Sequence, residues 1–363
     1  MAKKFGMKVY EFGFGFPPRA FGCFKDPKSG KWTLVLGKGK SSLKETVGGG
    51  ERLAEFPDTL YSINWLPLGG FVKIKGESGE ARNELDSFAA RSAWQRLVVL
   101  LAGVVMNFFL AAFLLSIGLM IGLPTDFSQG IDSKAIIVKP PQVLVQQVQP
   151  DSPASSAGIQ FGDRILKVNG LSLDKALQMI EIVRESKGQE LKFEIARGAD
   201  LLNISVLPRK DADIYRIGTV VADAGVIRYP WYLAIWKGVV AAVFGVLNIL
   251  FAFFYLIKNF ILGQGLAFDV AGPVGIAQIV GQSAQLGIHY IINVTAMISL
   301  SLAVMNVLPI PALDGGRALF VIIEKIIRRP VSMKYEQLAH TIGFILLLVL
   351  IVVVTMRDVR GLF

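Results

Sequence analysis

Four long apolar stretches constrain this chain more than any other feature of its sequence. They contain no Asp, Glu, Lys or Arg, and they run over residues 97–123, 238–257, 291–308 and 337–356. A helix that crosses a bilayer needs roughly 20 apolar residues, so these stretches have about the length that crossing requires. We therefore expect a polytopic α-helical membrane protein, with helices over residues 96–124, 231–262, 289–326 and 337–357.

The composition supports this fold class and limits the function classes. Of 363 residues, 53% are hydrophobic and 18% are charged, whereas soluble domains carry roughly 25% charged residues. The formal net charge of +10 would suit binding to nucleic acid or to an anionic membrane surface. The apolar stretches favour the membrane surface, and we expect no nucleic-acid partner. The single cysteine, Cys23, excludes an intrachain disulfide and a Cys-x-x-Cys zinc site.

The charges between the apolar stretches indicate an orientation. Lys and Arg outnumber Asp and Glu in residues 1–95 and 315–338, but the two signs balance in residues 124–230. Positively charged loops stay on the cytoplasmic side, so we expect residues 124–230 on the outer side of a multi-pass bacterial inner membrane. This orientation leaves residues 231–262 as a hairpin, an interfacial helix or a helix packed against the bundle.

Residues 1–95 alternate between apolar and other residues in three short runs. These runs cover residues 10–16, 31–36 and 71–75, and they are rich in aromatic and β-branched residues. A period of two predicts strands. Two interpretations stay open: a small soluble hairpin domain, or a membrane-associated β-structure beside an active site.

Residues 140–210 read as a compact domain with the order strand, turn, strand, helix, strand, strand. Its motifs are Ser-Pro-Ala-Ser-Ser-Ala-Gly at residues 152–158 and Gly-Asp-Arg-Ile-Leu-Lys-Val-Asn-Gly at residues 162–170. The segment resembles a PDZ domain of the bacterial protease type. Such domains bind an extended peptide as an added strand beside a helix.

We expect a PDZ groove between the helix at residues 174–186 and the strand at residues 142–148. The predicted peptide-binding residues are Val143, Val145, Leu177 and Ile180. The alternative is a domain that only packs on the membrane part and restricts access sterically.

The segment at residues 305–317, Met-Asn-Val-Leu-Pro-Ile-Pro-Ala-Leu-Asp-Gly-Gly-Arg, carries the strongest chemical signal. A carboxylate beside hydrocarbon is costly, so Asp314 indicates a functional role. Pro309 and Pro311 break the helix and free backbone groups that a cavity must satisfy. An acid beside unwound backbone suits a metal ligand.

These residues match the Asn-x-x-Pro-x-Pro-x-Leu-Asp-Gly pattern of the site-2 proteases at every position from 306 to 315. Further resemblances lie at residues 66–77, 102–107 and 272–276. The resemblance implies an intramembrane zinc metalloendopeptidase of the regulator of sigma-E protease type. Its substrates are transmembrane proteins, often trimmed first by an upstream protease. Asp314 is then a Zn²⁺ ligand, and Asn306, Pro309 and Pro311 support the substrate carbonyl or the oxyanion.

The family's His-Glu-x-x-His motif, which supplies two zinc ligands and the general base, does not occur in these residues. The residues at 2–9 and 12–16 resemble the stretch that follows this motif. We therefore expect an N-terminally truncated sequence whose 363 residues alone are inactive. The alternative is a catalytically inactive PDZ-containing membrane binding protein. A replacement zinc site from Cys23, His289, Asp314 and His340 is disfavoured.

Overall fold

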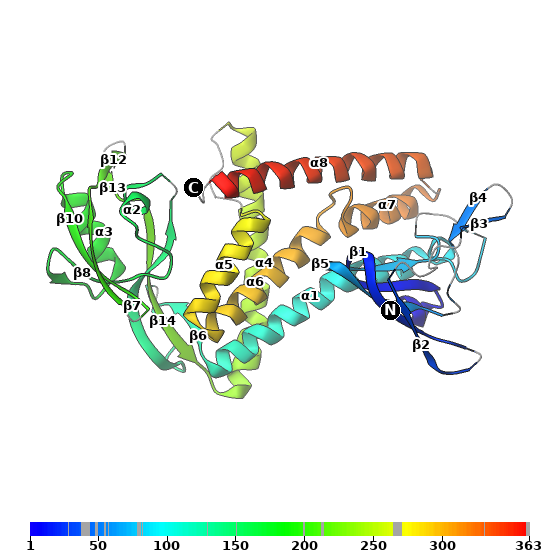
Figure 1. Ribbon diagram of the computed structural model, residues 1–363, viewed down its shortest axis with the longest axis horizontal. Coiled ribbons are helices and arrows are strands. Elements are labelled where there is room, and N and C mark those ends of the chain that lie inside the picture. The colour runs from blue at the N-terminus through cyan, green and yellow to red at the C-terminus, as the bar shows by residue number, and fades with distance from the viewer. Residues whose placement is uncertain are drawn as a thin grey trace. The chain divides into compact units, whose positions relative to one another are not determined.

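A computed structural model describes most of the chain. The described residues are 1–27, 29–37, 44–47, 50–53, 56, 58–77, 81, 83–128, 130–149, 151–198, 200–211, 214–263, 271–329 and 331–360. They form two compact units, one of residues 1–103 and 306–345 and the other of residues 104–305 and 346–363. Figure 1 labels the helices and strands along the chain.

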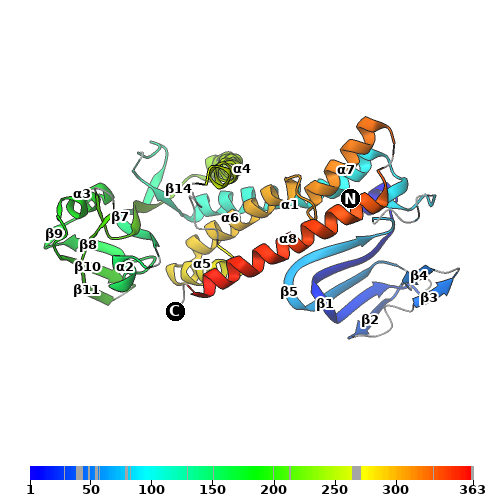
Figure 2. The same ribbon diagram turned by 90° about the horizontal axis from the view of Figure 1, so that it is seen from above.

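The first unit contains an antiparallel sheet in the strand order β2-β1-β5, which Figure 2 shows from above. β1 and β5 are long and bend, so Glu11 is paired with both Leu60 and Lys73 of β5. A separate hairpin consists of β3 and β4. The elements are η1 (Ala2–Phe5), β1 (Val9–Lys25), β2 (Trp32–Leu36), β3 (Lys44–Val47), β4 (Gly50–Leu53), β5 (Leu60–Ile74) and η2 (Phe88–Ala90).

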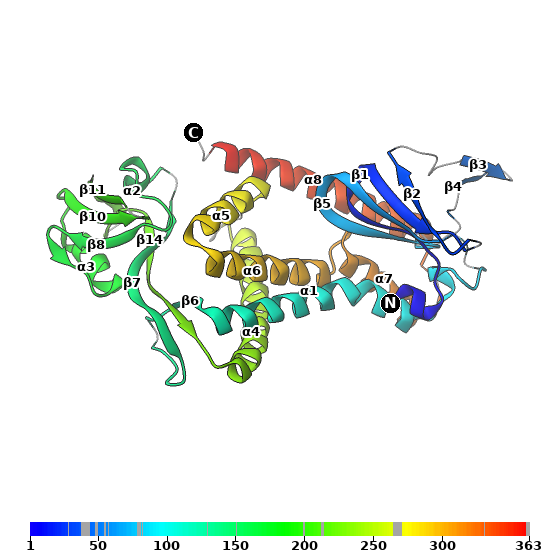
Figure 3. The ribbon, with the colours of Figure 1, turned by 60° about the horizontal axis from the view of Figure 1, so that its bottom comes forward.

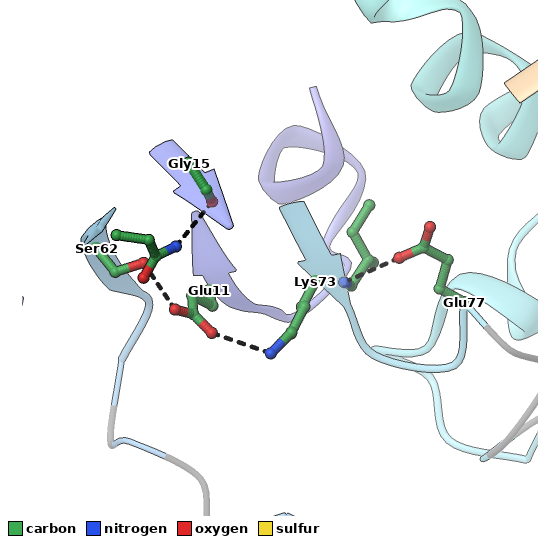
Figure 4. Close-up of polar contacts among 7 residues, drawn as sticks. Glu11, Gly15, Ser62, Lys73 and Glu77 are labelled. Atoms are coloured by element: carbon green, nitrogen blue, oxygen red, sulfur yellow. Dashed lines mark hydrogen bonds and ion pairs between the residues drawn. The ribbon is translucent and has the colours of Figure 1, made fainter. Parts of the chain in front are cut away.

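One face of this sheet carries a ladder of polar contacts (Figure 4). Ser62 Oγ donates to Glu11 Oε1 at 2.7 Å, and Lys73 Nζ donates to Glu11 Oε2 at 3.2 Å. Further along, Asn64 Nδ2 donates to the Gly15 carbonyl oxygen at 2.9 Å. Ser62 and Asn64 are buried, so these bonds avoid the cost of unsatisfied polar groups.

The opposite face of the sheet is apolar and exposed, because successive side chains along a strand point to opposite faces. Phe12 and Phe14, which alternate with Glu11 and Gly13, are each 53% exposed. The other exposed apolar side chains on these strands include Phe21, Trp32, Leu34, Tyr61, Ile63 and Trp65. Exposed apolar patches of this kind mark protein or membrane contacts.

The second unit contains a sheet in the order β11-β10-β8-β7-β14-β6, with β9 paired to β8. Its elements are β6 (Leu123–Asp126), β7 (Ile136–Val148), α2 (Pro153–Ser156), β8 (Arg164–Val168), β9 (Leu171–Ser172), α3 (Ala176–Glu185), β10 (Leu191–Arg197), β11 (Asp200–Val206), β12 (Arg209–Asp211), β13 (Ile214–Arg216) and β14 (Thr219–Arg228). Phe193, Ile195 and Val168 of the sheet pack with Met179 of α3 in a buried core. We call residues 136–228 the PDZ-like domain, after the sequence motifs above.

The Gly-Asp motif of the PDZ-like domain forms a partly buried ion pair. Asp163 is fully buried, and both of its oxygens accept from the Arg197 guanidinium at 2.8 Å. Asp163 Oδ2 also accepts from the Gln160 backbone N–H at 2.8 Å. The carboxylate therefore joins the turn before β8 to the end of β10, and it raises the pKa of Arg197.

Among the residues that the structure describes, four helices are long and apolar enough to cross a membrane: α1 (Ala93–Ile121), α4 (Trp231–Ile261), α6 (Ile288–Val307) and α8 (Met333–Arg360). The chain also forms α5 (Pro273–Leu286) and α7 (Asp314–Ile327). The predicted helix over residues 289–326 is therefore two helices, α6 and α7, with a break at residues 308–313.

Helices α1, α4 and α6 pack through small residues in the second unit (Figure 3). Ala111 of α1, Ala234 of α4 and Ala296 of α6 are fully buried. A Cβ atom at Gly238 of α4 would lie 2.2 Å from Ser116 Oγ of α1. Small residues let helix backbones approach closely. The hairpin expected as one option for residues 231–262 is wrong, because α4 is one continuous helix.

We predict that Arg197→Met destabilises the PDZ-like domain by about 3 kcal/mol, because it leaves the Asp163 carboxylate buried without its partner. Lys167→Met is the matched control, since it breaks the exposed Lys167–Glu194 pair on the neighbouring strands β8 and β10. That loss is expected to stay below about 1 kcal/mol. Hydrogen exchange of the β8 and β10 amides in the full chain measures both, and equal losses would contradict the account.

Candidate metal-binding segment and peptide groove

The segment between α6 and α7 presents Asp314 at the start of a helix. Pro309 and Pro311 lie in the break, where proline removes backbone donors and ends the helix. The Leu313 N–H donates to the Ile310 carbonyl oxygen at 3.2 Å, which closes a turn. Leu313 has extended backbone dihedrals and precedes the first residue of α7, Asp314.

Glycine is required at the two positions after Asp314. A Cβ atom at Gly315 would lie 2.1 Å from the Leu308 carbonyl oxygen, and one at Gly316 would lie 2.4 Å from that of Ile310. These atoms belong to backbone that a side chain cannot displace without rebuilding the break. The first turn of α7 therefore packs directly against the residues that follow α6, and this contact fixes where the Asp314 backbone lies.

Helix α8 supports the same break from another side. The Ala312 N–H donates to His340 Nδ1 at 2.8 Å, while Ala312 itself has a φ of 79°, which is unusual for a residue with a side chain. One turn further along α8, a Cβ atom at Gly343 would lie 2.6 Å from the Pro311 carbonyl oxygen. His340 and Gly343 therefore hold the two residues that precede Leu313 and Asp314.

An ion pair joins the first turn of α7 to the segment after β5. The Arg317 guanidinium donates to Glu77 Oε1, and Glu77 Oε2 accepts from the Ile74 backbone N–H at 3.3 Å. Figure 4 shows this second contact beside the polar ladder of the sheet. The segment at residues 66–77 therefore meets the Asp314 segment within one unit.

The residues predicted to act at a metal site lie along this segment. Asn306 is in the last turn of α6, Pro309 and Pro311 are in the break, and Asp314 begins α7. Sequence reasoning did not find His340 or Gly343 as supports. A glycine inside an apolar helix was the available sign of close backbone approach at Gly343.

The described residues do not complete a zinc site. Within these ranges, no three His, Cys, Asp or Glu side chains lie together as metal ligands would. His340 Nδ1 is used by Ala312, and His289 Nδ1 lies 2.7 Å from the Gly122 carbonyl oxygen. The Asp314 carboxylate has the chemistry of one oxygen ligand, and a zinc site would need further ligands beside it.

The PDZ-like domain contains a pocket of about 310 Å³ between α3 and the β13–β14 region. Met179, Ile180 and Val183 line it from α3, and Thr219 and Val221 line it from β14. β14 pairs with β6 from Ala224 onward, and the Phe127 N–H donates to the Asp223 carbonyl oxygen at 2.8 Å, so residues 219–222 keep one unpaired edge within the described sheet. Asp223 Oδ1 accepts from the Ala176 N–H at 2.6 Å, which fixes the start of α3 beside β14.

The prediction that the strand at residues 142–148 borders the groove is wrong. β7 is paired with β14 on one side and with β8 on the other, so its centre has no open edge. Val143 and Val145 are 2% and 0% exposed in the core. Leu177 is 62% exposed on α3 and does not line the pocket, whereas Ile180 does. The β-branched residues Thr219, Val220 and Val221 were the available sign of a strand beside this pocket.

Comparisons with known proteins agree with the sequence motifs. The family model described as "Peptidase family M50" matches residues 40–350 of this chain. A putative zinc metalloprotease of Clostridium perfringens is 31% identical over 361 residues, covering 99% of this chain and 92% of the relative. The regulator of sigma-E protease RseP of Escherichia coli is 28% identical, covering 86% of this chain and 90% of the relative.

Two further likenesses cover parts of the chain. The regulator of sigma-W protease RasP of Bacillus subtilis is 31% identical over 81% of this chain and 65% of the relative. The crystal structure of a PDZ domain from Listeria innocua matches 22% of this chain and 92% of its own length, with a TM-score of 0.20 and 25% identity. The family match spans most of the sequence, including the whole Asp314 segment, and the chain therefore belongs to peptidase family M50.

Proposed function

We propose that this membrane protein is an intramembrane zinc metalloendopeptidase that cleaves transmembrane protein substrates. The observation that carries the proposal is the placement of Asp314 as the first residue of α7, beside the break after α6. The two residues that follow Asp314 lie so close to the backbone of this break that only glycine fits there. Relatives over nearly the full length are named zinc metalloproteases, which supports zinc as the metal. Carboxylate oxygen is an ordinary zinc ligand.

Asp314 is the ligand that these residues contribute to the proposed zinc site. Zinc would supply a Lewis acid and an activated water to such a site. Asn306, Pro309 and Pro311 lie within one short segment before it. In the proposal, the Asn306 amide and the backbone freed by the two prolines hold an unwound substrate segment or its oxyanion. No hydrolytic step follows from the 363 residues alone.

The arrangement of charges supports a bacterial plasma membrane location with the PDZ-like domain on the outer side. Residues 1–95 and 315–338 carry the positive excess that cytoplasmic loops show. A domain on the outer side would meet the part of a substrate that an upstream protease has trimmed. Its groove between α3 and β14 would then take the new end of that substrate as an added strand.

A second candidate function, a catalytically inactive membrane protein that binds peptides, is favoured by this same groove. It needs only the 310 Å³ pocket and the open edge of β14. Loss of function on changing Asp314 separates the two candidates, because a binding protein does not require that carboxylate.

We predict that Asp314→Asn lowers cleavage of a transmembrane test substrate by at least about 100-fold in the protein as its gene encodes it, with a parallel loss of bound zinc. The neutral amide is a poorer ligand than the carboxylate of nearly equal size. Asp58→Asn, which removes an exposed carboxylate of the same unit, is the control and should leave both unchanged. Cleavage that survives Asp314→Asn would exclude the protease proposal.

We predict that Ile180→Asp weakens binding of an extended peptide with an apolar C-terminal residue by about tenfold or more, because it places a charge in the apolar groove. Leu177→Asp on the same helix is the matched control, since Leu177 is exposed and outside the pocket. Fluorescence anisotropy with a labelled library of such peptides and the full chain in detergent measures both. Equal affinities for the two variants would show that the pocket is not the peptide site.

A further inference from the structure

A second cavity lies where α1 begins and α7 ends, away from Asp314. It has a volume of about 260 Å³, several times the ~30 Å³ that one water occupies. Its lining is dominated by charged side chains of these two helices and the loop after α7. The lining residues are Ala89, Ala93, Arg96, Glu324, Lys325, Arg328 and Arg329.

The cavity carries a net positive charge. Four of its residues are cationic and one is acidic, which gives +3. Glu324 Oε2 pairs with Arg96 Nη2 at 2.7 Å, in an ion pair whose side chains are only 11% and 16% exposed. Among the residues that the structure describes, no carboxylate pairs with Lys325, Arg328 or Arg329. The three remaining cations are therefore available to an anion.

Stabilisation of α7 alone does not account for this cluster. A cation in the last turn of a helix interacts favourably with the helix dipole, and Lys325 has that position. Arg328 and Arg329 lie beyond the last turn, and Arg96 belongs to a different helix. The Nε atom of Arg96 is buried and has no hydrogen-bond partner in the structure, so the guanidinium has a donor that the protein does not satisfy.

The surroundings of the cavity are those of a membrane surface. Ala93 is the first residue of a helix long enough to span a bilayer, and Trp94 beside it is 68% exposed. Ile326 and Ile327, between Lys325 and Arg328, are 74% and 59% exposed. Exposed tryptophan at the end of a spanning helix is typical of the headgroup region. Apolar side chains interleaved with cations suit a ligand with a charged head and a hydrocarbon tail.

We propose that this cavity binds the phosphate headgroup of an anionic phospholipid in the leaflet where α1 begins. Arg96, Lys325, Arg328 and Arg329 surround the phosphate, and Trp94, Ile326 and Ile327 contact the acyl region. Basic pockets beside membrane helices bind anionic headgroups in this way. The lipid bridges α1 and α7, next to the ion pair that already joins them.

Native mass spectrometry of the full chain in detergent, titrated with phosphatidylglycerol, tests the proposal. Lys325→Gln with Arg329→Gln should weaken the tightest lipid site about thirtyfold, because each cation near an anionic headgroup contributes roughly fivefold in affinity. The charge-conserving pair Lys325→Arg with Arg329→Lys should bind like the unchanged chain. Lys4→Gln with Lys31→Gln removes two exposed cations of the same unit outside the cavity, and should also leave binding unchanged.

Two further ligands distinguish the source of the phosphate. Phosphatidylcholine, whose headgroup has no net charge, should bind at least about tenfold more weakly than phosphatidylglycerol at this site. Inorganic phosphate should not displace the lipid at equal concentration. The proposal is overturned if the Lys325/Arg329 double variant keeps full affinity, if the Lys4/Lys31 control loses as much, or if inorganic phosphate binds as tightly as the lipid.

Discussion

The close contact between the first turn of α7 and the backbone that follows α6 is the constraint on which the Asp314 segment depends. Gly315 and Gly316 lie so close to the carbonyl oxygens of Leu308 and Ile310 that a Cβ atom at either glycine would collide with them. Pro309 and Pro311 interrupt the helix just before, so that unwound backbone and a carboxylate lie together at the end of an apolar helix. Such a combination is costly in a membrane protein and is expected only where it serves a site.

Other elements of the first unit are arranged around this contact. Helix α8 reaches the break through His340 and Gly343, and the segment after β5 reaches α7 through Glu77 and Arg317. The Arg96–Glu324 pair then joins α7 to the start of α1. Three separate parts of the sequence therefore hold the short helix that carries Asp314, and the proposed lipid site lies at the far end of that same helix.

The sequence predicted the parts of this arrangement that depend on local patterns. The apolar stretches, the Pro-x-Pro break and the glycines after Asp314 each have a local physical meaning, and the motifs identified the family. The partners of these residues were not predictable, because His340 and Glu77 are distant from them in the sequence and no sequence pattern indicates which residues pair. The groove strand was misplaced for a similar reason: β7 and β14 are both rich in β-branched residues, and only their pairing shows which one keeps an open edge.

The most direct test of the central claim replaces Asp314 with a different ligand atom and observes the metal. Asp314→Cys, in a Cys23→Ser background, should introduce one sulfur neighbour at about 2.3 Å in zinc X-ray absorption spectra of the protein as its gene encodes it. The Cys23→Ser protein alone should show nitrogen and oxygen neighbours only. A zinc spectrum that is the same with and without Asp314→Cys would contradict the assignment of Asp314 as a zinc ligand.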